Sequence, residues 1–441
     1  MNKNYYITTP IYYPSAKPHM GHAYTSIIAD FFARFKRIDG FDVHFLTGTD
    51  EHGLKIQRAA ESKNIDPLEF CDLISQTFRD LSKTLNLSNT DFIRTTEKRH
   101  KKTVQHLWSE LEKNDDIYLS KYSGWYSVSD EAYYSEEEII ENNGKKVAES
   151  SGSSVEWIEE ESYFFRLSKW EGKLLDYYEK NSDFISPISR KNEVISFVKS
   201  GLKDLSISRK AFSWGIKVPG NADHVIYVWL DALTNYISAL DYPDTKSSLF
   251  KKYWPASVHL IGKDILRFHA VYWPAFLMAA KVPLPKKIYG HGWILSGEEK
   301  MSKSKGNILD PIDIINTYGL DPLRYYLIKE VSFGNDGSIS QDRLEDCINS
   351  DLANNYGNLC QRVTAFAEKN CSSLVPEIKE FSKEDLIMLN KFTKNLETIR
   401  QEIDNQNINF YISFIVSALF EANKYFNDQE PWKKKDDKDR L

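Results

Sequence analysis

The first fifty residues alternate between apolar segments and polar loops. Tyr5–Ile11 is rich in β-forming residues and predicts a strand, which a proline-containing loop follows. Over Gly21–Ile38 the apolar residues recur on one helical face, and Gly40 favours a stop just beyond it. Phe41–Leu46 predicts a second strand. A strand, helix and strand of these lengths form a βαβ unit, so we expect a parallel sheet with ligands at the carboxyl ends of its strands.

The pattern changes twice further along the chain. From about residue 117 to 217, short aromatic-rich stretches alternate with turns, which predicts a mixed insertion. The α/β pattern returns at residues 225–229, 258–262 and 287–291. After about residue 349 the apolar spacing is helical, so we expect an all-α C-terminal domain.

Composition narrows the class of protein. A chain of 441 residues predicts about two to four domains. The formal net charge of −6 excludes a surface coated for bulk nucleic-acid binding, so an RNA partner needs a local basic patch. No CxxC pair occurs among the four cysteines, which indicates a reduced, cytosolic protein. Because no apolar run suits a signal or a membrane span, we expect a cytoplasmic protein with no membrane partner.

The motif His19-Met20-Gly21-His22 lies between the first predicted strand and its helix. Backbone N–H groups and the helix dipole at such a helix start favour anions, and the glycine lets a ligand approach the backbone. Two imidazole donors can stabilise charge on a phosphoryl group in a transition state. The motif therefore predicts a polyphosphate site; two histidines that only cap a helix are the alternative.

A second motif, Lys300-Met301-Ser302-Lys303-Ser304, lies between glycines. Small and basic residues in this setting predict a loop that can bring ammonium groups onto a pyrophosphate. A solvated basic loop is the alternative. A chance match to these five letters is well below about one in a thousand, which favours the phosphate role.

In this order, with an insertion between them, the two motifs are the signature of class I aminoacyl-tRNA synthetases. The chain resembles the methionyl-tRNA synthetase family from Tyr5 to about Trp432. The resemblance implies an α/β fold, a split Rossmann-type parallel sheet with a mixed α+β connective insertion, and an all-α anticodon-binding helix bundle. The implied domains are a first Rossmann half, the insertion, a second Rossmann half, a stem-contact linker and the helical domain, at residues 1–116, 117–222, 223–305, 306–348 and 349–441. Family chains usually continue past Trp432, so the helical domain can be incomplete.

The resemblance also implies a methionine site. Stretches typical of the family precede the first motif, follow the second strand, follow the insertion and surround residues 261–273. Asp50 would pair with the substrate ammonium. The side-chain pocket would be lined by Ile11, Tyr13, Trp229, Ala232, Tyr236, Ile265, His269 and Trp273. A thioether is apolar and polarizable, and aromatic edges, tyrosine and histidine suit sulfur, although ordinary core aromatics are the alternative.

For ATP, the resemblance implies a site built from both motifs and the stretch before the second. Its residues would be His19, Gly21, His22, Gly292, Ile294, Lys300, Ser302 and Lys303. The two histidines and two lysines would act on the reacting phosphates, with Arg209 as a further catalytic residue. His291–Ile294 matches the stretch that packs against adenosine, where Gly292 would let the backbone approach the ring. Mg²⁺ would accompany the ATP phosphates.

Two features of the family concern metal and RNA. Many members carry a zinc knuckle with sets of four cysteines in the insertion, but here those positions hold Ser127, Asp130, Ala148 and Ser151. We therefore expect no structural zinc and no other protein-bound metal. In the helical region, the family residues that read the anticodon correspond to Asn358, Arg362 and Trp432, and the tryptophan would stack on a splayed base.

The implied function is that of a methionine–tRNA ligase: activation of L-methionine with ATP, then transfer to the 3′ end of tRNA(Met), by a monomer. One alternative is a class I synthetase for leucine, isoleucine or valine, which would need a larger editing insertion than about 100 residues. A non-catalytic RNA-binding paralogue would lose the histidines or the lysine loop. A smaller nucleotidyltransferase of this fold would lack the helical domain.

Overall fold

The computed structural model describes residues 3–130, 132–134, 136–142, 144–296, 299–300, 310–331, 333–375 and 380–434. Its contacts divide the chain into two units, Met1–His291 and Gly292–Leu441, which we describe separately. No helix within the described ranges combines the length and the apolar composition needed to span a bilayer.

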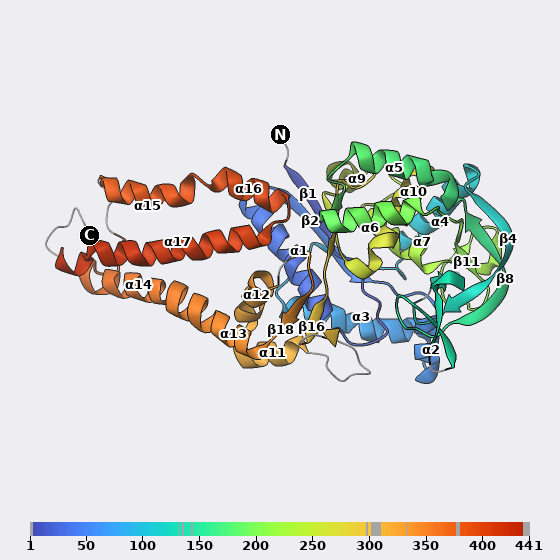
Figure 1. Cartoon of the computed structure of the whole chain (residues 1–441), viewed down its shortest axis with the longest axis horizontal. Coiled ribbons are helices and arrows are strands. Elements are labelled where there is room, and N and C mark those ends of the chain that lie inside the picture. Colours follow the sequence, from blue (N-terminus) through green and yellow to red (C-terminus); the bar gives the residue numbers. More distant parts are fainter. Residues whose placement is uncertain are drawn as a thin grey trace. The chain divides into compact units, whose positions relative to one another are not determined.

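A six-stranded parallel sheet forms the centre of the first unit (Figure 1). In spatial order its strands are β3 (Asp91–Arg94), β2 (Asp42–Thr49), β1 (Asn4–Thr8), β14 (Val258–Gly262), β15 (Ile288–His291) and β9 (Ile185–Ser186). Every residue of β15, and all but the first of β2, is buried. Strands that are buried on both faces have continuous apolar sequences. The sequence predicted β14 and β15 for this reason.

Helices connect and cover these strands. They are α1 (Met20–Ile38), α2 (Leu54–Ser62), α3 (Pro67–Thr84), α4 (Lys98–Lys113), α7 (Val228–Leu233), α8 (Asn235–Ser238), α9 (Ser248–Tyr253) and α10 (Trp273–Ala279), with a π-helical turn at Phe268–Tyr272. Local sequence sets the helix starts. The Asp66 carboxylate accepts the amides of Leu68 and Glu69, and Pro67 occupies the first turn, where its missing N–H costs nothing.

The order in which the chain connects the strands reverses between β1 and β14. From β1 the chain passes through α1 to β2 on one side, whereas from β14 it passes through α10 to β15 on the other. The two central strands are paired at Ile7–Val258 and Thr8–His259. Connections that leave in opposite directions open a crevice at the carboxyl ends of the two strands, the usual ligand position in such sheets.

The insertion between β3 and β14 is built mainly from antiparallel strands. One sheet contains β10 (Leu205–Ser206), β8 (Glu156–Phe165), β4 (Ile117–Ser127) and β5 (Ala132–Tyr134). A second contains β11 (Ser208–Arg209), β13 (Asn221–Ile226) and β12 (Lys217–Val218), and a hairpin joins β6 (Ile139–Asn142) to β7 (Lys145–Ala148). Two helices, α5 (Glu171–Lys180) and α6 (Ile188–Lys199), complete it.

Two assignments from the sequence are corrected here. Residues 225–229 do not resume the parallel sheet; Val225 and Ile226 belong to antiparallel β13, and α7 begins at Val228. Conversely β9, in the middle of the predicted insertion, pairs with β15 at the edge of the central sheet. Both errors have the same cause, since β-forming composition does not reveal which strand a segment pairs with.

The second unit is mostly helical. Its helices are α11 (Pro311–Tyr318), α12 (Leu320–Lys329), α13 (Gln341–Cys347), a π-helix (Ile348–Gly357), α14 (Asn358–Asn370), α15 (Lys383–Thr393), α16 (Leu396–Asp404) and α17 (Ile408–Gln429). A small sheet of β16 (Ile294–Ser296), β17 (Glu299–Lys300) and β18 (Gly337–Ile339) precedes them. Because β16 pairs with β18, residues 292–296 group with this unit, which differs from the predicted boundary at 305.

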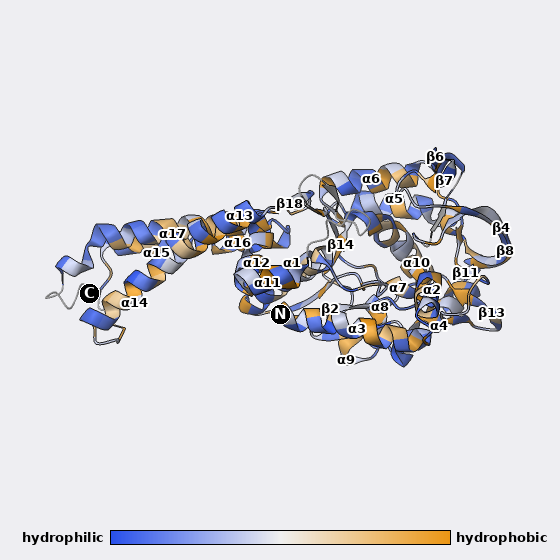
Figure 2. Cartoon of the chain, turned by 90° about the horizontal axis from the view of Figure 1, so that it is seen from below, coloured by the Kyte–Doolittle hydropathy of each residue, from blue (hydrophilic) through white to orange (hydrophobic). Residues whose placement is uncertain are grey.

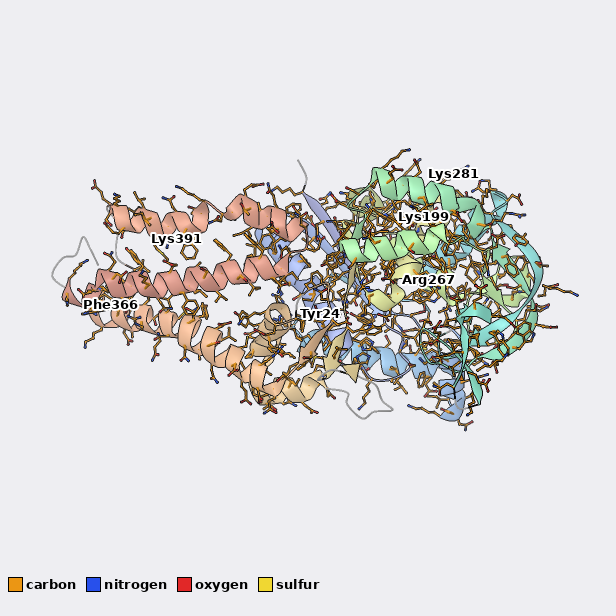
Figure 3. All side chains as sticks on the ribbon, viewed as in Figure 1. Tyr24, Lys199, Arg267, Lys281, Phe366 and Lys391 are labelled. Carbon is orange, nitrogen blue, oxygen red and sulfur yellow. The ribbon has the colours of Figure 1, made fainter. Side chains whose placement is uncertain are left out.

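An ion pair joins two helices of this unit, α15 and α17. Lys391, which projects from α15 in Figure 3, forms an ion pair of 2.5 Å with Glu421 of α17. Apolar and polar residues mix along α14, α15 and α17 (Figure 2). Several large apolar side chains remain exposed, among them Phe420 at 57%. The all-α character predicted for the residues after about 349 is confirmed.

Replacing Gly48 with alanine tests the packing of the sheet. An added Cβ would lie 2.0 Å from the carbonyl oxygen of Ile93, the partner residue on β3. We expect the free energy of unfolding to fall by about 1–3 kcal/mol, measured by urea denaturation. Gly172→Ala in α5 is the control, because its added Cβ meets no atom within 4 Å. A Gly48→Ala variant as stable as the wild type would contradict this packing.

Candidate active site

The first motif forms a reciprocal cap at the start of α1, beside the crevice. The amide of Gly21 donates to Nδ1 of His19 over 3.1 Å, and the amide of His19 donates to Nδ1 of His22 over 3.1 Å. Since each Nδ1 accepts a backbone hydrogen, each neutral ring carries its proton on Nε2. The cap therefore fixes two imidazole donors at a helix N-terminus, where an anion is favoured.

Packing keeps the second of these rings neutral. The His22 ring lies 3.9 Å from that of His19 and makes edge contacts with Tyr12 and Phe78, with centroids 4.8 and 5.2 Å away. Burial lowers the pKa of His22 well below its ordinary value, and the neighbouring His19 lowers it further. Near neutral pH, His22 is thus a hydrogen-bond donor without charge.

The end of β15 is hydrogen-bonded to the second turn of α1. Nε2 of His291 lies 2.9 Å from the hydroxyl of Thr25, which also lies within 3.1 Å of the Gly21 carbonyl. The Tyr24 ring stands edge-on to His291 at 5.2 Å. His291 therefore helps to set the position of the glycine in the histidine motif, a connection that the sequence did not reveal.

Gly292 and Ile294 belong to the second unit. A Cβ on Gly292 would lie 2.1 Å from the backbone of Asn335, so no larger residue fits. The sequence explained this glycine by approach to a nucleotide ring; the structure adds close contact with the chain's own backbone. Ile294 is buried and begins β16.

The lysine motif is only partly within the described residues. Lys300 ends the two-residue strand β17, which pairs with Leu295 and Ser296 of β16. Ser302 and Lys303 lie outside the described residues. Their predicted roles rest on the sequence.

The predicted methionine-pocket residues come from four segments of the first unit. Ile11 and Tyr13 follow β1, Asp50 follows β2, and the others lie on α7, α8 and the stretch after β14. The buried members are Asp50, Ala232, Tyr236, His269 and Trp273, and the partly buried members are Ile11, Tyr13, Trp229 and Ile265. Six of the eight predicted side-chain contacts belong to, or pack against, one hydrophobic cluster: Ile11, Tyr13, Trp229, Tyr236, Ile265 and Trp273. His269 bonds Tyr236 of that cluster.

A neutral hydrogen-bonded chain runs through these residues. Nδ1–H of His269 donates to the carbonyl of Ile265 over 3.0 Å, so its Nε2 accepts from the Tyr236 hydroxyl at 2.7 Å. Burial lowers the pKa of His269 to about 4 and raises that of Tyr236 above its usual range. Neither side chain is charged at neutral pH, which suits an apolar ligand.

Aromatic stacking holds Trp229 and Tyr236, whose rings both lie beside that of His269, in place. The Trp229 ring stacks on Phe268 at 3.7 Å with 5° between the planes, and the Tyr236 ring stacks on His259 at 4.0 Å. His259 in turn bonds the hydroxyl of Thr8 on β1 over 2.8 Å. Phe268 and His259 were not singled out from the sequence, although both lie within or beside the stretches typical of the family.

Asp50 and Arg209 occupy different surroundings. The Asp50 amide donates to the Tyr12 carbonyl over 2.9 Å, which fixes this buried residue just beyond β2. Arg209 is buried on β11 in the insertion, where its guanidinium donates to Ser206 and Ser208 and lies 4.4 Å from the Tyr227 ring. Tyr227 immediately precedes α7, so Arg209 contacts the base of a helix that carries pocket residues.

The predicted anticodon residues come together in the second unit. Arg362 on α14 donates to Asn427 over 2.5 Å and lies 4.8 Å from the ring of Phe426. Phe426 is also 6.1 Å from the ring of Trp432, which is 41% exposed. Exposed Asn358 lies one turn before Arg362 on the same helical face. A cation, an amide and an exposed indole thus share one surface.

Three of the four knuckle positions, Ser127, Asp130 and Ser151, are joined by hydrogen bonds through the Asp130 carboxylate and amide. Asp130 accepts the hydroxyls of Tyr134 at 2.7 Å, Ser151 at 2.5 Å and Ser153 at 2.7 Å, and its amide donates to Ser127. This oxygen-rich set lacks the thiolates and imidazoles that zinc prefers. Across the described ranges, no group of three or more His, Cys, Asp or Glu side chains could hold a metal ion.

A pH-dependent loss of stability should arise from His269. Its folded-state pKa of about 4 is below the ordinary value of 6.5, so the unfolded chain takes up the proton first as the pH falls from 6.5 toward 4. Between pH 7 and 5.5 we expect the wild type to lose about 1 kcal/mol more unfolding free energy than His269→Gln, whose amide can still accept from Tyr236. Urea denaturation at both pH values measures this, and equal losses would contradict it.

The sequence is similar to a known protein family and to proteins of known function. The model of the family described as class I tRNA synthetases (M) matches residues 5–364. The methionine–tRNA ligase of Brucella suis is 53% identical over 431 residues, covering 98% of this chain and 83% of that protein. That of Rickettsia conorii is 54% identical over 445 residues, covering 100% of this chain and 87% of that protein.

A solved structure agrees over nearly the whole chain. Mycobacterium tuberculosis methionyl-tRNA synthetase in complex with methionyl-adenylate is 48% identical, with a TM-score of 0.96, over 99% of this chain and 87% of that one. The resemblance drawn from the histidine and lysine motifs, and the fold class it implied, are thereby confirmed. The chain belongs to the methionine–tRNA ligase family of class I aminoacyl-tRNA synthetases.

Proposed function

We propose that this chain activates L-methionine with ATP and transfers it to tRNA(Met). The observation that carries the proposal is the neutral Tyr236–His269 pair beside a crevice whose other wall holds the His19–His22 cap. A pocket without charge selects an apolar side chain, and a fixed pair of imidazole donors suits a polyphosphate. The likeness to a structure that holds methionyl-adenylate, the product of the activation step, supports that step.

The first step joins methionine to AMP. The methionine carboxylate attacks the α-phosphorus of ATP, a new oxygen–phosphorus bond forms, and pyrophosphate leaves. Asp50 holds the ammonium group, the Nε2 donors of His19 and His22 stabilise the phosphoryl oxygens, and Arg209 adds positive charge near the pocket. Lys300 and Lys303 stabilise the leaving pyrophosphate. Catalysis is by positioning and electrostatics, without a covalent enzyme intermediate.

Specificity comes from the pocket walls. Trp229, Trp273 and Tyr236 present ring surfaces, and aromatic edges contact sulfur favourably by about 0.3–1.5 kcal/mol. Tyr236 is held by His269, so its position is fixed before the ligand enters. Ile11, Tyr13, Ala232 and Ile265 complete the proposed lining. Gly21, Gly292, Ile294 and Ser302 are the remaining proposed ATP contacts.

Magnesium enters this proposal with ATP. The described residues offer no group of three acidic or imidazole side chains for a protein-held ion, so phosphate oxygens would supply its ligands. When bound, it would neutralise phosphate charge. For the knuckle, the hydroxyl-rich surroundings of Asp130 do not fit zinc, and we derive no role for that metal.

In the second step the terminal ribose hydroxyl of the tRNA attacks the aminoacyl carbonyl, and AMP leaves. Asn358, Arg362 and Trp432 are the proposed anticodon contacts. Phe426 supports this proposal because it contacts both Arg362 and Trp432, which fixes a stacking surface beside a guanidinium. We further propose that the protein acts in the cytoplasm as a monomer.

Exchange of labelled pyrophosphate into ATP, run with each of the twenty amino acids and no tRNA, tests the first step. We expect exchange with methionine alone. Exchange with leucine, isoleucine or valine instead would keep the reaction class and overturn the pocket. No exchange with any amino acid would favour a non-catalytic RNA-binding role.

The anticodon proposal is tested by Trp432→Ala and Arg362→Ala. Loss of base stacking costs about 1–3 kcal/mol per base, so kcat/KM for tRNA(Met) should fall at least about fivefold in the charging reaction. Methionine-dependent pyrophosphate exchange should stay within twofold, since that step needs no tRNA. Lys391→Ala is the control, because it removes a cation from the same unit away from this surface. Equal losses in charging for all three variants would contradict the assignment.

A further inference from the structure

Behind the proposed methionine pocket lies a buried carboxylate held between two histidines. Asp231 on α7 is fully buried. Its Oδ2 lies 2.6 Å from Nδ1 of His52, and its Oδ1 lies 2.7 Å from Nε2 of His100. Both histidines are buried as well, at 2% and 0% exposure. A charge so far from water needs both bonds, because losing either leaves a buried polar group without its partner.

The carboxylate is ionised. Burial alone raises the pKa of Asp231, but the two histidines outweigh it and lower the pKa to about 2. Each imidazole therefore donates an N–H to one carboxylate oxygen. Charge-assisted hydrogen bonds of this kind are short and strongly directional, so they fix the relative positions of the residues that carry them.

His52 connects this carboxylate to the loop that carries Asp50. Its ring bonds Asp231, while its carbonyl accepts the Tyr13 hydroxyl over 3.1 Å. On its other side the ring meets Trp214 edge-on at 5.5 Å, and Trp214 donates its indole N–H to the Glu51 carbonyl over 2.5 Å. Loop residues 50–53 are thus held in one position between the insertion and α7.

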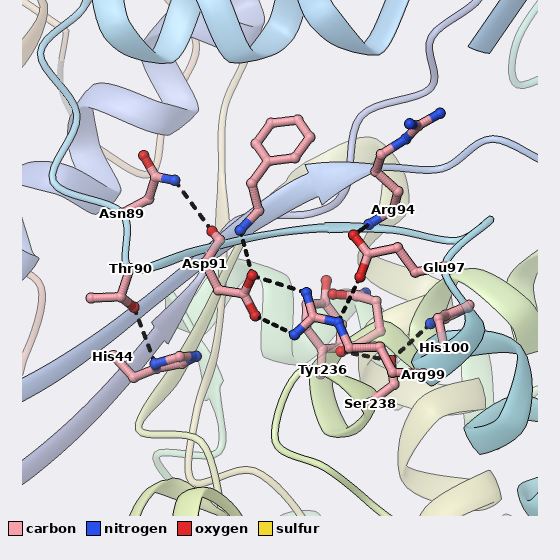
Figure 4. A network of polar contacts seen from close by, with 12 residues as sticks. His44, Asn89, Thr90, Asp91, Arg94, Glu97, Arg99, His100, Tyr236 and Ser238 are labelled. Atoms are coloured by element: carbon pink, nitrogen blue, oxygen red, sulfur yellow. Dashed lines mark hydrogen bonds and ion pairs between the residues drawn. The ribbon is translucent and has the colours of Figure 1, made fainter. Parts of the chain in front are cut away.

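His100 connects the same carboxylate to α8. Nδ1 of His100 lies 2.8 Å from the hydroxyl of Ser238, and Ser238 ends the short helix that carries Tyr236. Figure 4 marks this contact with a dashed line. The neighbouring Arg99 is anchored separately, by Asp91 at 2.8 and 2.9 Å. Since α4 has this independent attachment to β3, the bond of His100 to Asp231 acts on α7 and α8.

Asp231 supports α7 from the side away from the pocket. It lies two residues after Trp229, which is about 200° of rotation around a helix, and it immediately precedes Ala232. One carboxylate therefore joins the loop of Asp50, the helix of Trp229 and the helix of Tyr236. The loop lies far from the two helices in the sequence, with 179 positions between His52 and Asp231, so the chain's connectivity does not fix their relative positions.

We propose that His52, Asp231 and His100 form a positioning unit for methionine. They do not touch the substrate; they hold the ammonium-binding loop and the side-chain wall in register, so that the pocket is formed before methionine binds. Preorganisation of this kind acts on affinity for one substrate. The inference rests on the proposed function, because it takes Asp50, Trp229 and Tyr236 as methionine contacts.

The test is the ratio of two Michaelis constants in pyrophosphate exchange. For Asp231→Asn and His52→Ala we expect KM for methionine to rise at least tenfold, while KM for ATP stays within threefold. His52→Asn is the rescue variant, because its side-chain amide can take the place of Nδ1 and donate to Asp231. Its KM for methionine should lie within threefold of wild type. If Asp231→Asn fails to fold, the two His52 variants decide the question.

Asp30→Asn supplies the matched control. Asp30 is also fully buried; it bonds Arg34 within α1 and joins that helix to Ser88, with bonds of 2.6–2.7 Å. It should lower the thermal midpoint as much as Asp231→Asn but leave KM for methionine within twofold. An equal rise in KM for methionine from Asp30→Asn would overturn the proposal. So would parallel rises for methionine and ATP, or a His52→Asn variant no better than His52→Ala.

Failure of the proposed function gives a different result. If the wild type shows no methionine-dependent exchange, the function is wrong before any variant is compared. If Asp50→Asn and Trp229→Ala leave KM for methionine unchanged while exchange proceeds, the pocket assignment is wrong. If those two variants raise KM for methionine and Asp231→Asn does not, only the positioning unit is excluded.

Discussion

The pairing of β1 with β14 is the constraint on which the rest of the first unit depends. It places Thr8 beside His259, 251 positions away, and joins them by a side-chain bond as well as by the strand ladder. Because the chain leaves the two strands in opposite directions, their carboxyl ends border a crevice. The capped histidines follow one strand and the His269 segment follows the other, so the pairing brings the two proposed substrate sites together.

Charge is distributed around this crevice in a consistent way. The side chains proposed to face methionine's thioether, Tyr236 and His269, form a neutral pair, while the ionised Asp231 lies behind them with an imidazole on each oxygen. An unpaired charge at the pocket surface would penalise an apolar ligand, whereas a paired one at the back adds directional bonds without that cost. Backbone amides fix the tautomers of His19 and His22, so even the phosphate donors need no charged ring.

Much of the site was predictable because its functional residues lie in short, contiguous sequence motifs. Histidines at a strand–helix junction follow from local rules for helix starts and anion binding, and the reciprocal cap agrees with them. The nine methionine-pocket positions came from the resemblance, and six of them lie in or against one hydrophobic core. Phe268, which stacks on Trp229, lies within the family-typical stretch of residues 261–273, but nothing in its spacing distinguished it from ordinary core.

The sequence by itself determined the family, the parallel sheet, the insertion and the helical region, because local periodicity and short motifs encode each of them. Only the tertiary structure decided the partners. Residues 225–226 pair antiparallel although their composition suits either sheet, and β9 joins the central sheet through two residues. The carboxylate of Asp231 meets His52 and His100 from 179 and 131 positions away. Such contacts depend on which surfaces the folded chain brings together, and no local pattern records that.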